Sequence, residues 1–419
     1  MRIAVIGAGV IGTTTAWYLA RHGHEVTVVD RAAEPAEETS HANGALLHAS
    51  HAEPWNAPGV LWDLLRWIGR EDSPLLLRPG SLPSMAGWGL RFLRYSGQRH
   101  FDRSTRVNAQ LAVHSLRLLR ELRRETGIRY DDAQQGIIKI FRDQASLDKA
   151  LHASHLMDAM GVRHSVLDAR GTVALEPALG DVAHELSGSI HYPDDESGDA
   201  HLFTLKLADL ARARGVDFQM KTSVQRLVRE GHRITGLETD AGPVTADAYV
   251  LAAGSLAAPL ARPLGLKLPI YPVKGYSITL PCGSWAGAPV IPLIDDANKV
   301  VFTPLGERLR MAGTAEFTGF DLSLNRVRAE SVLRQVLKTL PSLEPHAERS
   351  QLTPWCGLRP MSADGVPILG DSGITNLYLN CGPGHLGWTF ACGLGSLLAD
   401  HISGAATALP LAPLAAGRF

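Results

Sequence analysis

The first thirty residues constrain the fold more than any other part of the chain. Residues 2–6 are mostly β-branched and apolar, which is typical of a strand buried on both faces of a sheet. Glycines follow at positions 7, 9 and 12, then a stretch with helical spacing of apolar residues, then a strand-like run over residues 25–29 that ends at Asp30. This order of strand, glycine turn, helix and acidic strand end predicts a βαβ unit that binds a dinucleotide.

Each residue type in this unit has a physical task. Gly7 permits the tight turn, Gly9 lets the backbone approach a pyrophosphate, and Gly12 lets the helix pack closely on the strand. Free N–H groups and the dipole at the helix N-terminus favour the pyrophosphate anion. Asp30 can accept hydrogen bonds from ribose hydroxyls and would repel the 2′-phosphate of NADP. The alternative is a glycine turn in an unrelated α/β fold, which explains less of the pattern.

The loop over residues 31–44 favours FAD as the dinucleotide. It is polar, rich in small residues and long enough to wrap an extended, bent cofactor, whereas the alternative is a plain surface loop. Its second half resembles the flavin family of D-amino acid oxidases, sarcosine oxidases and D-amino acid dehydrogenases. The residues that carry this likeness are Thr39, Ser40, Ala42, Asn43 and Gly44.

Composition excludes several classes of function. A chain of 419 residues usually divides into two or more domains, because one core stops growing well before this size. The formal net charge is -1, with 41 Lys and Arg against 42 Asp and Glu, so no nucleic-acid partner is expected. Four cysteines without a C-x-x-C pair predict a reducing compartment and no zinc site, and the acidic loop at residues 193–199 lacks calcium spacing, so no metal is expected. We also expect no signal peptide and no membrane-spanning run, and hence a cytoplasmic protein, soluble or bound at a membrane surface.

Periodicity predicts the remaining elements. Helices are expected over residues 61–68, 89–95, 108–126, 147–160 (capped by Ser146), 201–215 and 327–340. Strands are expected over residues 136–141, 187–192, 216–228, 233–237, 246–251, 268–273, 276–280, 300–303 and 309–313. Tryptophans 55, 62, 67 and 88 interleave with arginines, which fits either a patch on an anionic membrane or the core of a helical subdomain, and we favour the core.

Two motifs near the C-terminus carry the chemistry. Glycines 382, 384 and 387 precede a helix, and such a turn exposes N–H groups that stabilise negative charge on a reduced cofactor. Arg359 lies between Leu358 and Pro360, where a cation needs a partner. That partner is either a substrate carboxylate, held bidentately, or an internal acid such as Asp364, and the residues alone leave both open.

The whole chain resembles the small-subunit-type D-amino acid dehydrogenase family. The matching stretches include VIGAGVIG at residue 5, Pro54-Trp55, residues 195–199 and 202–204, residues 271–277, residues 357–361 and residues 386–389. The resemblance implies a Rossmann-like FAD-binding domain of the glutathione-reductase type with a β-sheet and helical substrate-binding domain. It implies oxidative deamination of D-amino acids to 2-oxo acids and ammonia, by hydride transfer from Cα to flavin N5. It also implies that electrons pass to a quinone or another non-oxygen acceptor, at the inner face of the cytoplasmic membrane.

These arguments define the predicted domains and site. The FAD-binding domain is predicted over residues 1–90, 190–265 and 346–419, and the substrate-binding domain over residues 91–189 and 266–345. The predicted catalytic residues are Arg359, Tyr276 and His385. The predicted substrate-binding residues are Arg359, Tyr276, Tyr271, His48 and His51, with Arg359 on the substrate carboxylate. The predicted cofactor contacts are Gly7, Gly9, Val10, Ile11, Gly12, Asp30, Arg31, Thr39, Ser40, Ala42, Asn43, Gly44, Val224, Ala253, Gly254, Gly357, Gly384, His385, Leu386, Gly387, Trp388 and Thr389.

Two stretches depart from the family pattern and leave the substrate open. They are residues 44–51 and the pair Pro383 and His385, where the family commonly has other residues. D-proline or hydroxy-D-proline is therefore one alternative substrate, and a sarcosine or glycine oxidase that uses oxygen is another. A non-catalytic flavin-binding redox sensor is the alternative of another class. His48 and His385 are candidate proton acceptors, although His48 is more simply a hydrogen-bonded structural residue.

Overall fold

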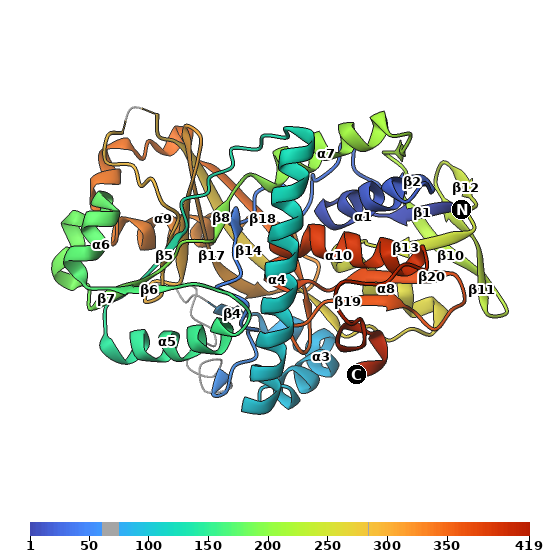
Figure 1. Ribbon diagram of the computed structural model, residues 1–419, viewed down its shortest axis with the longest axis horizontal. Coiled ribbons are helices and arrows are strands. Elements are labelled where there is room, and N and C mark those ends of the chain that lie inside the picture. Colours follow the sequence, from blue (N-terminus) through green and yellow to red (C-terminus); the bar gives the residue numbers. More distant parts are fainter. Residues whose placement is uncertain (61–74, 284) are drawn as a thin grey trace.

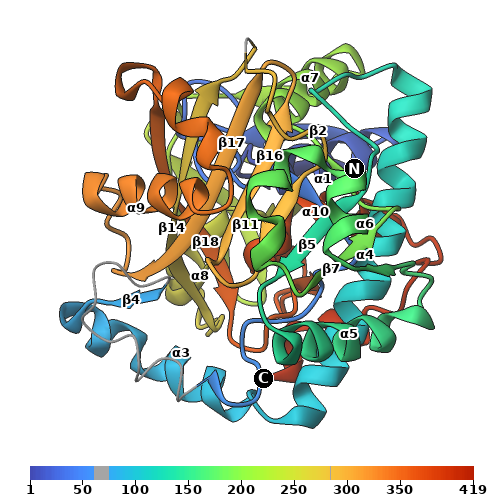
Figure 2. The ribbon, with the colours of Figure 1, turned by 90° about the vertical axis from the view of Figure 1, so that its left-hand side faces the viewer.

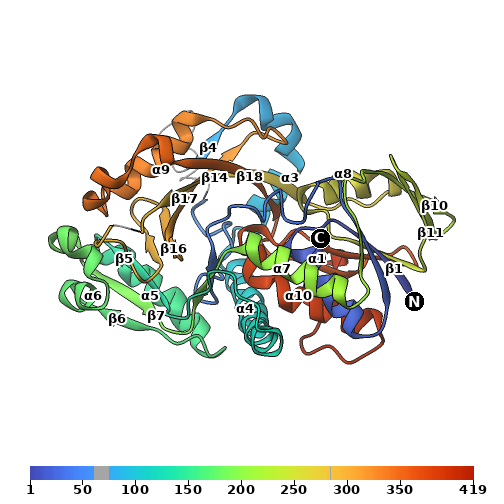
Figure 3. The same ribbon diagram turned by 90° about the horizontal axis from the view of Figure 1, so that it is seen from above.

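Figure 1 shows a computed structural model, which describes residues 1–60, 75–283 and 285–419. Two sheets lie side by side, and the long helix α4 (Gln98–Thr126) runs between the two halves of the molecule (Figures 1 and 3). The predicted α/β class is confirmed. The predicted helix over residues 61–68, with Trp62 and Trp67, lies outside the described residues.

The first sheet contains the predicted βαβ unit. Its strand order is β19-β20-β13-β1-β2-β9, and β1 is paired in parallel with both β2 and β13. The strands are β1 (Arg2–Ile6), β2 (Glu25–Val29), β9 (Asp217–Gln219), β13 (Ala248–Leu251), β19 (Ile368–Asp371) and β20 (Leu377–Cys381). Alternate side chains of β1 enter two different cores, as a strand in the middle of a covered sheet requires.

Helices cover one face of this sheet and a small antiparallel sheet covers the other. α1 (Val10–Arg21) and α10 (Gly387–Ile402) pack together, with α7 (Ala200–Ala213) against α1 and α4 against α10. Small residues in α10 allow it to approach α1 closely, since a Cβ at Gly395 would lie 2.9 Å from the backbone carbon of Thr14 in α1. The opposite face carries α8 (Ala257–Ala261) and strands β10 (Val224–Glu230), β11 (Arg233–Thr239) and β12 (Gly242–Val244).

The second sheet is larger and mostly antiparallel. Its order is β18-β14-β17-β16-β15-β5-β7-β6, with β4 (Leu75–Leu77) beside β17. The strands are β5 (Ile137–Phe141), β6 (Ser165–Leu167), β7 (Gly188–Tyr192), β14 (Ile270–Pro281), β15 (Leu293–Asp295), β16 (Val300–Leu305), β17 (Arg308–Phe317) and β18 (Thr353–Ser362). α9 (Arg326–Leu337) packs on β14, β16 and β17, and Figure 2 shows it beside this broad sheet, with α3 (Leu82–Arg94) below. The remaining elements are α5 (Gln144–Asp158), α6 (Ala169–Leu175) and the short pair β3 (Leu46–Leu47) and β8 (Glu196–Ser197).

Several predictions about elements were wrong in detail. α3 begins at Leu82 rather than at residue 89, and residues 216–228 contribute to two strands, β9 and β10, in different sheets. α4 begins at Gln98, ten residues before the predicted start, because residues 98–107 are largely polar and show no apolar periodicity. Asp143 caps α5 by accepting from the Ser146 N–H at 2.8 Å, so Ser146 is not the cap. The two strands predicted over residues 268–280 are one strand, β14, because Lys274 and Gly275 interrupt the apolar pattern but stay paired with β18.

The sheets divide the chain differently from the predicted domain ranges. β4 and β18, which the prediction assigns to the FAD-binding domain, pair within the second sheet. α4, assigned to the other domain, packs on α10 of the first half. The two-domain division remains a prediction, but these pairings place β18 and its Arg359 in the second sheet.

Candidate active site

A cavity of about 1400 Å³ lies between the two sheets. Both sheets line it, together with the β1–α1 turn, the loop after β2 and the turn before α10. All but three of the predicted cofactor contacts line this cavity, as do Arg359, Tyr276, His48 and His51. The exceptions among the cofactor contacts are Gly12, Leu386 and Thr389, and Tyr271 of the substrate set also lies outside the lining.

The β1–α1 turn has the close packing that its glycines predict. Gly7 has a φ of 109°, and a Cβ there would lie 2.6 Å from the Ala252 carbonyl oxygen. A Cβ at Gly12 would lie 1.8 Å from the Gly7 oxygen, so Gly12 acts through helix packing rather than contact with the cavity. A Cβ at Gly9 would meet only Ser40 Oγ, at 3.5 Å, so this backbone faces open space at the N-terminus of α1. The geometry fits a pyrophosphate.

Asp30 holds the turn together at the end of β2. One carboxylate oxygen accepts from the Ala8 N–H at 2.6 Å, and the other accepts from the Ala32 N–H at 2.8 Å. Each oxygen has a second lone pair, and Asp30 lines the cavity, so it can still accept from a ribose hydroxyl. Arg31 beside it pairs with Glu38.

The loop over residues 39–45 is anchored to the second sheet. Ser277 donates to the Ala42 carbonyl at 2.6 Å, Arg310 donates to the Asn43 carbonyl at 3.0 Å, and Thr303 donates to the Gly44 carbonyl at 2.8 Å. These donors lie on β14, β17 and β16, whereas Thr39 Oγ1 donates to the Leu358 carbonyl on β18 at 2.8 Å. The loop therefore connects the β1–α1 turn to the second sheet.

The turn before α10 gives the cavity a second helix N-terminus. Gly384, with a φ of 63°, and Gly387 line the cavity, and α10 begins at Gly387. Leu386 is instead buried in the core, and Thr389 Oγ1 accepts from the His48 N–H at 3.2 Å. These two predicted contacts support the wall rather than form it. Two helix N-termini, an open glycine backbone and Asp30 together fit a negatively charged, extended cofactor such as FAD.

Arg359 is a half-buried cation without an acidic partner among the described residues. It extends from β18, its Nη1 donates to the Thr314 carbonyl at 3.3 Å, and its guanidinium lies 5.5 Å from the Trp55 ring centre. Burial lowers its pKa well below the ordinary guanidinium value, to about 10. The alternative partner Asp364 pairs with Arg418 at 2.7 Å, so an internal ion pair between Arg359 and Asp364 is excluded.

Gly275 makes room for this guanidinium. A Cβ at Gly275 would lie 2.1 Å from Arg359 Nη1, although the residue is in a regular strand with no positive φ. Any side chain there would displace Arg359. The sequence did not mark Gly275 as functional, because the requirement arises from the pairing of β14 with β18 across the sheet.

Histidines form the wall next to Arg359. His385 stacks on Trp55 with 5.4 Å between ring centres, and the rings of His48 and His51 are 5.7 Å apart. His51 Nδ1 lies 3.2 Å from a carboxylate oxygen of Glu53. Burial, with nearby positive groups, lowers the pKa of His385 to about 3 and that of His48 well below its usual value. Trp55 and Glu53 also line the cavity, and sequence reasoning missed both as site residues.

The two predicted tyrosines are engaged elsewhere. Tyr276 lines the cavity, but its hydroxyl donates to Glu316 at 2.5 Å, so the predicted donation to a substrate carboxylate conflicts with this bond. The Tyr271 hydroxyl accepts from the Gly319 N–H at 3.1 Å, and its ring packs against Trp88 and Phe317. The predicted substrate contact of Tyr271 was therefore wrong: the side chain belongs to the core around α3.

Residues 2–401 match the family model described as FAD dependent oxidoreductase. The chain belongs to this family. Its cofactor is therefore FAD and it is an oxidoreductase. It is 47% identical over 420 residues to the D-amino acid dehydrogenase of Paramagnetospirillum magneticum, covering 100% of this chain and 99% of that protein. It is 46% identical to the D-amino acid dehydrogenase of Dechloromonas aromatica, covering 96% of this chain and 97% of that one.

Solved members of the same fold include enzymes with other substrates. The L-proline dehydrogenase of P. horikoshii superposes with a TM-score of 0.79 at 20% identity, covering 100% of this chain and 97% of that one. The glycine oxidase of Geobacillus kaustophilus gives 0.77 at 23% identity, covering 100% and 99%. These likenesses establish the fold of this FAD-dependent oxidoreductase. They do not identify its substrate, which has to be inferred from the residues of its own cavity.

Proposed function

We propose that this oxidoreductase deaminates D-amino acids oxidatively to 2-oxo acids and ammonia, with Arg359 as the anchor of the substrate carboxylate. The observation that carries the proposal is the half-buried guanidinium at the cavity wall, which has no acidic partner among the described residues. A buried charge is costly unless an opposite charge reaches it, and a carboxylate matches the guanidinium in shape and charge. The high identity to proteins named D-amino acid dehydrogenase supports the same substrate class.

The residues of the chain bind and orient the substrate rather than move its protons. When bound, FAD supplies the acceptor for the two electrons and the hydrogen that leave the α-carbon. Arg359 fixes the carboxylate, and Trp55 beside it limits the positions that the side chain can take. An imidazole whose pKa is about 3, such as His385, is neutral near pH 7 and is too weak a base to take up the ammonium proton of the substrate. The substrate therefore reacts as the neutral amine and releases its ammonium proton to solvent.

Anaerobic mixing with matched substrates tests this function. The absorbance of oxidised flavin should fall with D-amino acids and stay constant with their L-forms, because Arg359 and the cavity wall orient only one enantiomer. Both prolines, hydroxy-D-proline, glycine and sarcosine belong in the panel. Reduction by glycine or sarcosine alone, with peroxide formed in air, would replace the proposal with an amine oxidase. A bound flavin that no amine reduces would favour a binding protein.

We further propose that α3 brings the site to an anionic membrane surface on the cytoplasmic side, where a quinone accepts the electrons. The inner face of α3 places Met85, Trp88 and Phe92 in the cavity wall, which is apolar there. The outer face exposes Leu82 and Leu90 together with Arg91 and Arg94, whereas Leu93, although partly exposed, also lines the cavity. Apolar and basic groups on one exposed face suit a surface of anionic lipid. No helix among the described residues is long and apolar enough to cross a membrane.

Co-sedimentation with vesicles tests this surface. The chain should bind vesicles that contain phosphatidylglycerol, and Leu90→Glu should release it, because the leucine is 72% exposed on α3. Val290→Glu is the matched control, since that side chain is also exposed, at 57%, and lies outside α3. Equal binding by both variants would refute the assignment of α3.

A further inference from the structure

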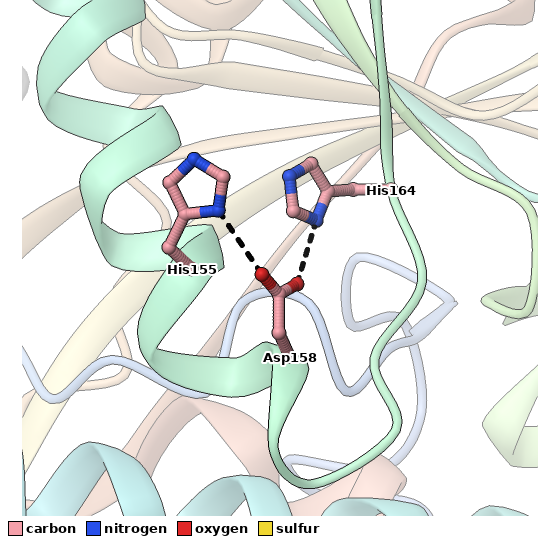
Figure 4. A group of neighbouring side chains, drawn as sticks. All are labelled: His155, Asp158 and His164. Atoms are coloured by element: carbon pink, nitrogen blue, oxygen red, sulfur yellow. Dashed lines mark hydrogen bonds and ion pairs between the residues drawn. The ribbon is translucent and has the colours of Figure 1, made fainter.

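A group of metal-ligand side chains lies at the end of α5. His155 and Asp158 belong to the last turn of the helix, and His164 lies just before β6 (Figure 4). The Asp158 carboxylate is 3.0 Å from His155 Nδ1 and 3.1 Å from His164 Nδ1. Both imidazoles thus point toward one carboxylate, and the ligand atoms of the three residues lie within 4.8 Å of one another.

His164 lacks a satisfactory hydrogen bond in this group. Its side chain is only 9% exposed, and Nδ1 is buried. Although Nδ1 is near Asp158, it makes no hydrogen bond of acceptable geometry with any described residue. A buried imidazole nitrogen that has only this close approach to a carboxylate, and no well-directed hydrogen bond, recovers only part of its lost hydration. A cation coordinated by this nitrogen would compensate for that loss.

We propose that His155, Asp158 and His164 bind a first-row divalent transition metal, for which Zn²⁺ is the probe. Two imidazoles and one carboxylate form a ligand set suited to Zn²⁺, Ni²⁺ or Cu²⁺, whereas Mg²⁺ and Ca²⁺ prefer oxygen ligands alone. Ligands of Zn²⁺ lie roughly 2.0–2.2 Å from the ion, so three atoms gathered this closely need only small side-chain movements to surround it. The other face of His155 and Asp158 is open, with exposed fractions of 59% and 49%, so water can complete the coordination.

The ion would connect α5 to β6 beside the active-site cavity. The turn between Asp158 and His164 contains Gly161, whose φ is 82°, so the two ends of the turn are brought together by the backbone. Another face of α5 lines the cavity through Ser146, Lys149, Ala150, His152, Ala153 and Leu156. A metal bridge at the last turn would therefore restrain a helix that forms part of the cavity wall. Sequence analysis predicted no metal, because His164 lies nine residues from His155 and only the fold brings them together.

Zinc titration of the full-length, FAD-loaded protein tests the site. After treatment with a chelator and its removal, calorimetry with ZnCl₂ should show one site that is tighter than any other. His155→Ala, Asp158→Asn and His164→Ala should each weaken it by at least about tenfold, since even an outer-shell partner of a metal ligand contributes that much. His184→Ala is the matched control, because His184 is an exposed histidine whose side chain lies near Glu185 on another helix. It should leave the affinity unchanged.

Hydrogen exchange gives a second readout that is independent of the flavin reaction. Zn²⁺ should slow amide exchange over residues 155–167 in the wild type and not in Asp158→Asn, which preserves the shape of the side chain. Equal zinc affinity in the three variants and the control would overturn the proposal, as would equal exchange with and without the ion. Neither readout uses a D-amino acid, so failure here and failure of the proposed function are distinguishable.

Discussion

Replacing Arg359 with methionine should change stability and catalysis in opposite directions. Burial lowers the pKa of Arg359 well below the ordinary guanidinium value, to about 10. At roughly 1.4 kcal/mol per pKa unit, keeping this cation in the folded state without substrate costs about 3 kcal/mol. Methionine has a similar length and no charge, and only one hydrogen bond, to the Thr314 carbonyl, is lost. The variant should therefore unfold at a temperature equal to or above that of the wild type.

Catalysis should fall steeply in the same variant. A bidentate guanidinium–carboxylate pair contributes two charge-assisted hydrogen bonds of about 1.5–3 kcal/mol each. Their loss corresponds to a decrease in kcat/KM of about 10² to 10⁴. Arg359→Lys keeps the charge but not the planar fork, so it should lose about half of that free energy, mainly as a higher KM. Anaerobic stopped-flow measurement of flavin reduction against D-amino acid concentration gives both parameters.

Arg310→Met is the matched comparison for Arg359→Met. Arg310 is also a buried arginine whose pKa is lowered to about 10 by burial, but it donates to Thr279 and to the Asn43 carbonyl. Its loss leaves these acceptors without a donor, so this variant should be less stable than the wild type. If Arg359→Met is destabilised as much as Arg310→Met and still reduces flavin at the wild-type rate, Arg359 is structural and the proposed function loses its main support.

Two further predictions concern residues of the same site, and a third concerns Asp195, a buried carboxyl that accepts from the Ala49 N–H at 2.9 Å. Gly275→Ala should displace the Arg359 guanidinium and raise KM by tenfold or more, which corresponds to a loss of at least roughly 1.4 kcal/mol of binding free energy. The flavin absorbance per protein should stay constant. An unchanged KM would contradict the packing distance. Since the pKa of His385 is about 3, this residue does not titrate between about pH 5 and 9. His385→Gln should therefore leave the midpoint of the pH–rate profile in that range unchanged, even if the rate itself changes. A shifted midpoint would mean that His385 does titrate in that range. Burial raises the pKa of the Asp195 carboxyl from 3.8 to about 7, so the folded protein binds the carboxyl proton more tightly than the unfolded chain does. The free energy of unfolding should therefore fall as the pH rises from about 4 to about 7, by up to about 4 kcal/mol in total. Asp195→Asn should flatten this loss in thermal unfolding measured at pH 5 and 8, and curves of equal slope would refute it.

Local patterns were sufficient to predict the cofactor-binding unit. β1, the glycine turn, α1, β2 and Asp30 are contiguous in the chain, and each carries its own signal: β-branched strands, glycines at turn spacing and an acid at the strand end. The residues that hold this unit together act over short distances in sequence. The lining of the cavity by residues 7–44 follows from that locality, whereas Val224, Gly357 and Gly384 reach the cavity only through the tertiary fold.

Long-range pairing decided the substrate side of the cavity. β14 and β18 are separated by more than seventy residues, and only their pairing places Arg359 over Gly275 and next to Trp55. The same fold pairs Asp364 with Arg418 and leaves Arg359 without an acidic partner among the described residues. The sequence had left both possibilities open. Whether a buried charge has a partner depends on which side chains the fold brings within a few ångströms, and residue spacing along the chain carries no information about that distance.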